Sequence, residues 1–205
     1  MQMPARPLFD ARSVAVFAIA ATLLAVPSPL AAHEGGTAAG LLSGLLHPIS
    51  GADHVLAMIA VGIWGAQLGQ PAIWVLPVTF PMVMALGGML GLLGIPLPGV
   101  EVGIGLSALL LGIMVAREAR PPLKAAAVLV AFFAVFHGYA HGAELPEGQS
   151  GILYSIGFVA STGTLHACGI AIGVIHRWDW GRTLLKVMGL LIALAGVWFT
   201  WGALQ

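Results

Sequence analysis

The chain has 205 residues, of which 59% are hydrophobic and only 8% are charged. A soluble domain usually carries about 25% charged residues, so this composition excludes a soluble globule and predicts an all-α integral membrane protein. The formal net charge of +0 gives no indication of a nucleic-acid partner. The single cysteine, Cys168, excludes an intramolecular disulfide and a cysteine-rich zinc site.

Residues 1–32 have the pattern of a secretory signal peptide. Arg6 and Arg12 form a positive region. The apolar run over residues 13–26 has the length of a signal peptide and is too short to span a bilayer comfortably. We expect cleavage after Ala32, which leaves residues 33–205 as a single transmembrane domain.

The predicted cleavage point is imperfect and has a consequence for metal binding. Leu30 stands where a smaller residue is usual, so an uncleaved anchor is the alternative. Cleavage after Ala32 would make His33 the first residue of the mature chain. Its imidazole and the free amine would then form a candidate metal-binding pair, whereas the ordinary interpretation of His33 is a disordered polar terminus.

Six apolar segments follow the leader, and together they predict a six-helix transmembrane bundle. The first segment is too long for one straight helix, because a span needs about 20 residues, and Pro48 and Gly51 divide it. We expect a half-helix over residues 38–46, a break, and a full helix from about Pro48, with His47 as its N-cap residue. The six segments lie at approximately 38–68, 72–95, 100–116, 124–144, 151–175 and 183–203.

The Lys and Arg residues that follow the leader occur in only two loops, after the third and fifth segments. They are Arg117, Arg120, Lys124, Arg177, Arg182 and Lys186. By the positive-inside rule, the loops 117–124 and 176–186 should be cytoplasmic, and both termini should lie outside a bacterial-type inner (plasma) membrane. The opposite side carries carboxylates that would attract cations, namely Glu34, Glu101, Glu144 and Glu147.

Ionisable side chains inside a membrane are costly, so they are candidates for function. Most of them fall in two short groups near the outer side: His47, Asp53 and His54 in "HPISGADHVLAM", and His137, His141 and Glu144 in "FHGYAHGAE". Three ligand-type residues in each of two segments are difficult to explain by packing alone. Imidazole and carboxylate together favour borderline divalent ions such as nickel, cobalt or zinc.

Helix geometry restricts how these side chains could share an ion. His137 and His141 are i,i+4 neighbours on one helix face, and Glu144 extends the same stripe. His47 and His54 would be about 10.5 Å apart along a straight helix, so they can share an ion only if the chain between them is irregular. Adjacent residues such as Asp53 and His54 point about 100° apart, so one could ligate while the other orients a ligand.

Two further residues are candidate ligands outside these groups. Glu101 opens the third segment at its outer end, and His166 lies within the fifth segment. For His166, which has Thr162 one turn before it, a helix–helix hydrogen bond is an equally good interpretation. We expect no permanently bound cofactor, because the ion would be the cargo.

The two motifs resemble the HupE/UreJ family of nickel/cobalt permeases. Members carry a His, five residues and then Asp-His in the first membrane segment, which His47, Asp53 and His54 match. They also carry a Phe-His-Gly…His-Gly-x-Glu pattern, matched by Phe136, His137, Gly138, His141, Gly142 and Glu144. The resemblance covers nearly the whole mature chain. It implies a signal peptide, six spans, and a need for the His and acidic residues of both motifs in the uptake of nickel or cobalt.

Two other functions use the same residues. One is an intramembrane zinc hydrolase, although the H-E-x-x-H pattern is absent and Ser150 in "GQSG" is more simply a helix N-cap than a nucleophile. The other is a metal sensor or assembly protein, which the lack of an appended soluble domain disfavours. We favour a permease rather than an enzyme. Its partners would be the ion and the bilayer, and glycine-rich faces such as "GGMLGLLG" could pack within or between chains.

Overall fold

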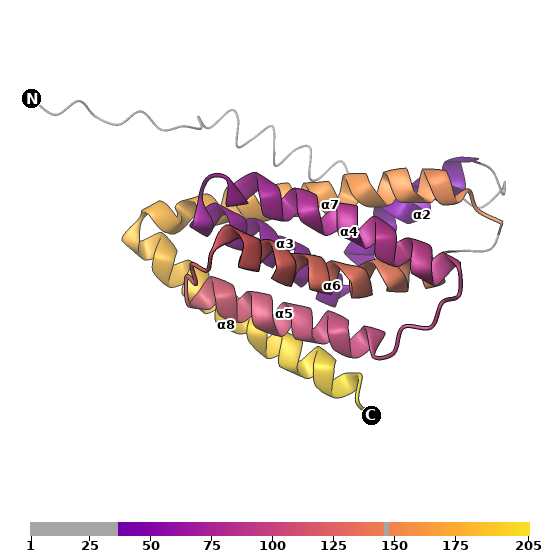
Figure 1. Ribbon diagram of the computed structural model, residues 1–205. Helices are drawn as coiled ribbons and strands as arrows, with labels where there is room; N and C mark the ends of the chain where they lie inside the picture. Colours follow the sequence, from indigo (N-terminus) through magenta and orange to yellow (C-terminus); the bar gives the residue numbers. More distant parts are fainter. Residues whose placement is uncertain (1–36, 146–147) are drawn as a thin grey trace, which may run out of the picture. The chain divides into compact units, whose positions relative to one another are not determined.

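Helices make up nearly all of the part of the chain that the structure describes. The computed structural model describes residues 37–145 and 148–205, so the predicted signal peptide and His33 lie outside the described residues. The helices, drawn in Figure 1, are α2 (Thr37–Ser50), α3 (Ala52–Leu68), α4 (Ala72–Leu92), α5 (Val100–Ala116), α6 (Leu123–Ala143), α7 (Gly151–Gly173), the short 3-10 helix η2 (Val174–Arg177) and α8 (Asp179–Gly202).

The helix α3 is the centre of the bundle. It packs against α4, α5, α7 and α8, and its side chains from Ala57 to Gln67 are almost all buried. Two polar side chains near its end are paired with carbonyl groups at the end of α5. Trp64 Nε1 donates to Ala119 O at 2.8 Å, and Gln67 Nε2 donates to Val115 O at 3.1 Å. These bonds join α3 to the end of α5 and to the loop that follows it.

Glycines bring the helices together in pairs. The most extensive contacts are between α4 and α6, α5 and α8, and α7 with both α2 and α3. In each pair a Cβ added to a glycine would overlap the backbone of the partner helix, as at Gly142 against Gly88, Gly196 against Leu109 and Gly62 against His166. Small residues allow this close approach. The resulting van der Waals packing holds the helices together, because lipid provides no hydrophobic driving force between them.

Every predicted segment contains a helix, but fewer than six of the segments are long and apolar enough to count as membrane spans. Four helices are long and apolar enough to cross a membrane, namely α4, α6, α7 continued through η2, and α8. The pair of α2 and α3 passes the same test together, with a bend of 80° between its two helices, and gives a fifth. The remaining predicted segment, 100–116, is α5, which is apolar but has only 17 residues. The chain is therefore a multi-pass, all-helical membrane protein.

The predicted break in the first segment exists, but its predicted position is wrong. Pro48 lies inside α2, so His47 is a residue of the last turn of that helix and not an N-cap. The helix tolerates Pro48 because the ring removes only one N–H, near the helix end. The Ser50 hydroxyl donates to His47 O at 2.7 Å in this last turn. The chain becomes extended at Gly51, with φ −101° and ψ 118°.

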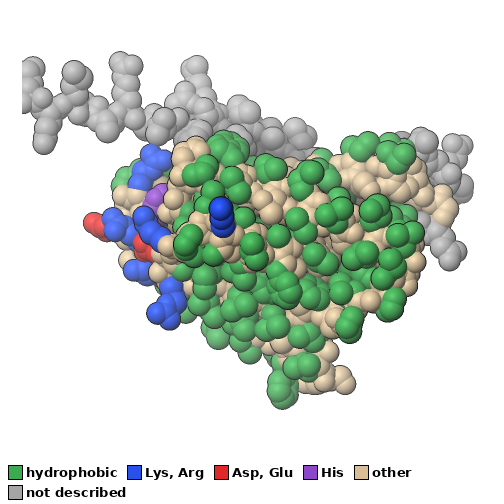
Figure 2. Space-filling view, viewed as in Figure 1, with side chains coloured by type: hydrophobic (Ala, Val, Ile, Leu, Met, Phe, Trp, Pro, Cys, Tyr) green, Lys and Arg blue, Asp and Glu red, His purple; other side chains and the backbone are tan. Residues whose placement is uncertain are grey.

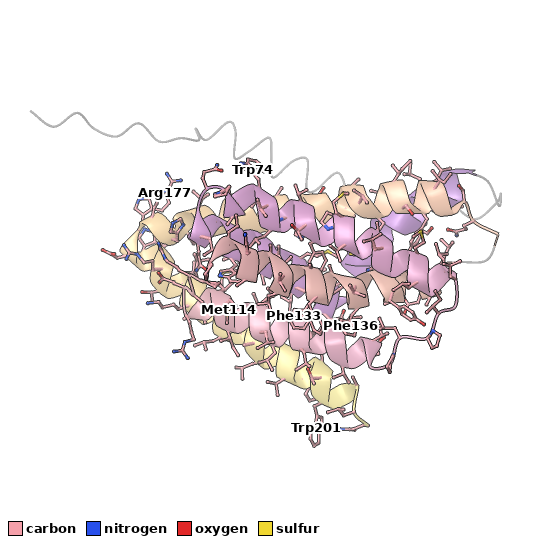
Figure 3. The ribbon with its side chains drawn as sticks, in the orientation of Figure 1. Trp74, Met114, Phe133, Phe136, Arg177 and Trp201 are labelled. Carbon is pink, nitrogen blue, oxygen red and sulfur yellow. The ribbon has the colours of Figure 1, made fainter. Side chains whose placement is uncertain are left out.

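The outer surface of the bundle is that of a membrane protein. Figure 2 shows the Lys and Arg side chains of one face gathered toward the end where α7 meets α8, and hydrophobic side chains over the rest. Exposed tryptophans lie near both ends: Trp74 and Trp180 near the basic end, and Trp198 and Trp201 at the far end of α8 (Figure 3). Trp180 and Trp201 are separated by about 30 Å of helix, which is the thickness of a bilayer core.

Candidate metal site

The break between α2 and α3 places the histidines on either side of it against a third histidine. His47 lies in the last turn of α2 and His54 in the first turn of α3. The centroid of the His141 ring, on α6, lies 4.7 Å from that of His47 and 4.6 Å from that of His54. The irregular backbone at Gly51 thus allows both rings to contact the same imidazole, which a straight helix would not allow.

The remaining residues of the second motif complete the group. The ring of His137 lies 4.7 Å from that of His54, between centroids. Glu144, just after the end of α6, places Oε2 3.1 Å from His47 Nε2. The structure therefore brings six of the predicted residues together, and we call them the histidine cluster: His47, Asp53, His54, His137, His141 and Glu144.

Asp53 orients its neighbour His54. Its Oδ1 lies 2.9 Å from His54 Nδ1 and accepts a hydrogen bond of 2.8 Å from His54 N. A Cβ at position 51 would lie 2.7 Å from the same oxygen, so the absence of a side chain at Gly51 leaves room for this pair. A carboxylate that holds one ring nitrogen of a histidine fixes the tautomer and leaves the other nitrogen for a ligand.

The side chains of the cluster differ in solvent exposure, from largely exposed to fully buried. The exposed fraction of the side chain is 57% for Glu144, 26% for His47 and 12% for His54, and His137 is fully buried. An ion that met the carboxylate of Glu144 first could therefore pass to imidazoles of decreasing exposure. The two carboxylates together carry the charge that would balance one divalent cation.

The imidazole rings meet edge to face or tilted and are not arranged around an ion. Within residues 37–145 and 148–205, no three His, Cys, Asp or Glu side chains are positioned to hold one metal ion as they stand. Several buried nitrogens nevertheless have no hydrogen-bond partner, namely His54 Nε2, His137 Nδ1 and both ring nitrogens of His141. Buried polar atoms without hydrogen-bond partners are energetically costly, so binding an ion would stabilise these nitrogens. The side chains would have to rotate to point at one ion.

The second motif divides its residues among three faces of α6. His137 and His141 face the cluster. Gly138 and Gly142 pack against the backbone of α4. Phe136, labelled in Figure 3, packs against Gly103 of α5, where an added Cβ would come within 2.5 Å of the ring. The glycines and the phenylalanine of the motif therefore position the helix, and its two imidazoles lie in the histidine cluster.

Two predicted residues lie apart from the cluster, and a third lies outside the described residues. Glu101 is exposed in the first turn of α5 and forms no ion pair among the described residues. His166 is buried in α7, and its ring lies against Phe80 rather than against the cluster. His33 lies outside the described residues.

Three residues near the cluster were not predicted from the sequence. Ser107 Oγ lies 2.8 Å from His137 Nε2, and the same hydroxyl donates to Ile104 O at 2.6 Å. The ring of Phe80 lies 5.3 Å from that of His137, and the ring of Phe158 lies 4.1 Å from that of His141, between centroids. A signal for Ser107 was present, since it is the single hydroxyl residue of the apolar helix α5. Nothing distinguishes Phe80 or Phe158 from other core aromatics in sequence.

The hydroxyl of Ser107 gives a first testable prediction. Because it donates to Ile104 O, it can accept from His137 Nε2 and so keep Nδ1 of the neutral ring free. Ser107→Ala should weaken nickel binding to purified protein by about 10- to 100-fold, as the loss of a partner of a ligating histidine does. Equilibrium dialysis would measure it, with Ser155→Ala in α7 as control, since that exposed hydroxyl bonds only Gly151 O. Unchanged affinity in Ser107→Ala would remove Ser107 from the site.

Comparison with known proteins decides the family. The family model described as HupE / UreJ protein matches residues 21–199 of the chain. The chain belongs to the HupE/UreJ family. It is also 46% identical over 173 residues to Protein HupE of Rhizobium leguminosarum bv. viciae, an alignment that covers 84% of this chain and 91% of that protein. No solved structure matches the chain.

Membership of the HupE/UreJ family agrees with the family predicted from the two motifs, and the match extends over most of the helices. It gives no support to the alternative of a hydrolase. Ser150, the residue considered as a nucleophile, is the N-cap of α7, and its side chain accepts a hydrogen bond of 3.4 Å from Leu153 N. This HupE/UreJ chain thus uses Ser150 to begin a helix.

Proposed function

We propose that the chain is a permease that takes up nickel or cobalt, with the histidine cluster as the site that receives the ion. The observation that carries this proposal is the convergence of four imidazoles and two carboxylates from α2, α3 and α6 in a chain of the HupE/UreJ family. Mixed nitrogen and oxygen ligands favour borderline divalent ions over calcium or magnesium.

The proposed orientation follows from the two ends of α6. Lys124 lies at its beginning, and His141 lies about 25 Å further along the helix axis. Under the positive-inside rule the basic end is cytoplasmic, so the histidine cluster faces the outside of a bacterial-type inner membrane. Six spans, with α5 as a short one, then leave both termini outside. A length of 17 residues is at the lower limit for a span.

The residues would act in sequence as the ion moves inward. Glu101 and, after cleavage of the leader, His33 would collect cations at the outer surface. Glu144 and His47 would receive the ion, and the more buried His54, His137 and His141 would exchange ligands with it, while Asp53 holds His54. The ion is cargo in this scheme, so the permease would hold no permanent cofactor and catalyse no covalent reaction.

The test is the uptake of radiolabelled nickel and cobalt by cells that express the chain. Asp53→Asn should lower uptake by at least about tenfold, because the loss of a partner that orients a ligating histidine costs 10- to 100-fold. The matched control is Asp179→Asn, since this carboxylate is fully exposed at the basic end and pairs only with Arg182. Membrane levels of each protein would be measured by immunoblot.

Uptake by the wild-type chain that does not exceed that of cells without it, for both ions, would refute the permease. Wild-type uptake that Asp53→Asn leaves unchanged would keep the permease and remove Asp53 from its site.

A further inference from the structure

His166 occupies an unusual position in the middle of α7. It lies about 22 Å along the helix axis from the beginning of α7 and is only 2% exposed. Its ring lies against the backbone of Pro77 in α4, where a hydrogen bond to the Pro77 carbonyl can form. The carbonyl of Pro77 is available for this bond because the residue four positions later, Pro81, has no N–H. His166 can therefore satisfy the carbonyl that Pro81 leaves unpaired in this membrane helix.

This hydrogen bond leaves the other nitrogen of the ring unused. His166 Nε2 is buried and has no partner among the described residues, so the nitrogen that donates to Pro77 is Nδ1. A neutral imidazole that donates through Nδ1 carries a lone pair on Nε2. An imidazole with Nδ1–H on a backbone carbonyl and a free Nε2 has the arrangement that metal-ligating histidines commonly adopt.

Unpaired hydroxyls accompany this nitrogen. Thr162 lies one turn before His166 on α7, is fully buried, and its Oγ1 has no partner. The neighbouring Ser161 is 5% exposed, and its Oγ is also unpaired. Residues four apart lie on the same face of a helix, so Thr162 and His166 present an oxygen and a nitrogen to the same space. Polar atoms without partners at this depth are energetically costly, and a transiently bound ion would offset that cost.

The ring of Phe80 links these atoms to the histidine cluster by contacting both. Its centroid lies 5.3 Å from that of His137 and 5.5 Å from that of His166. One aromatic ring of α4 therefore contacts both the deepest imidazole of the cluster and the isolated imidazole of α7.

We propose that His166 Nε2 and Thr162 Oγ1 form a second, weaker binding station for the divalent ion, next to the Phe80 ring that also contacts His137 of the histidine cluster. The proposal rests on the permease function proposed above and adds a step to it. One imidazole and one hydroxyl bind a borderline ion less tightly than the cluster does. Weak binding suits a station that an ion must leave, since conduction requires sites that release as well as bind.

The test separates transit from binding at the cluster. His166→Gln keeps a side-chain N–H that can donate to Pro77 and removes the imidazole ligand. We expect uptake of nickel by cells to fall at least about tenfold, because a metal ligand is lost. Equilibrium binding of nickel to the purified full chain should change less than about twofold, because the cluster dominates it. Thr162→Val should lower uptake in the same direction, and its matched control is Thr164→Val, whose exposed hydroxyl bonds only Ala160 O.

Each other outcome overturns the station. Wild-type uptake in both His166→Gln and Thr162→Val, beside loss of uptake in Asp53→Asn, would remove the second station and leave the permease in place. A parallel loss of equilibrium binding and uptake in His166→Gln would show that His166 acts through the cluster. If His166→Gln lowers the amount of folded protein, Thr162→Val against Thr164→Val decides. Absence of uptake in the wild-type chain would refute the permease itself.

Discussion

Replacing His141 with alanine is expected to reduce nickel and cobalt uptake to the level of cells that lack the protein. His141 is the residue of the cluster that touches both sides of the broken helix, with its ring 4.7 Å from that of His47 and 4.6 Å from that of His54. Both of its nitrogens are buried without partners. The loss of uptake should exceed the 10- to 100-fold effect typical of an outer-shell partner, at roughly 100-fold or more, because a ligand itself is removed.

The control for His141→Ala is His176→Ala. This histidine lies at the basic end, in η2, and its Nδ1 is within 2.9 Å of Gly173 O. Uptake of nickel and cobalt by cells that express His176→Ala should stay within about twofold of the wild-type rate, as expected for a surface substitution away from a site. Uptake in His141→Ala above half of the wild-type rate, at equal protein levels, would contradict the proposed site.

The second large effect is expected from Gly142→Ala, through assembly of the helices. A Cβ at this position would overlap the carbonyl oxygen of Gly88 and come within 2.7 Å of its carbonyl carbon. These are backbone atoms, so no change of rotamer can relieve the overlap, and α4 and α6 must move apart. Overpacking of this kind costs about 1–3 kcal/mol and sometimes more. We expect a lower Tm of the purified protein in detergent and a smaller monodisperse fraction.

Gly163→Ala is the matched control, because an added Cβ there meets nothing within 4 Å. It should leave the Tm unchanged or raise it slightly, since alanine is the better helix former. A Tm of Gly142→Ala equal to that of Gly163→Ala would refute the close contact between α4 and α6.

Much of the fold could be predicted from hydropathy and basic residues, because lipid imposes long apolar helices on the chain. The grouping of the two motifs could also be anticipated, since Pro48 and Gly51 signalled a break between His47 and His54. The exact position of that break could not. A proline three residues from a helix end removes only one hydrogen bond, whereas the extended backbone at Gly51 ends the helix.

The parts that sequence reasoning missed depend on contacts between helices distant in the chain. Ser107 reaches His137 from α5, and Phe80 reaches His137 from α4. Their relevance arises only from the crossing of helices, which periodicity does not specify. The role of Asp53 was left open between ligating and orienting, and its bond to His54 Nδ1 favours orientation.

The bend of 80° between α2 and α3 also sets the local electric field. A helix carries roughly half a negative charge at its carboxyl end and half a positive charge at its amino end. At this break the carboxyl end of α2 and the amino end of α3 meet beside His47 and His54. Asp53, in the first turn of α3, offsets the positive end, so the dipole of α2 remains as a fixed partial negative charge. The backbone itself therefore favours a cation at the one place where the membrane helix is interrupted.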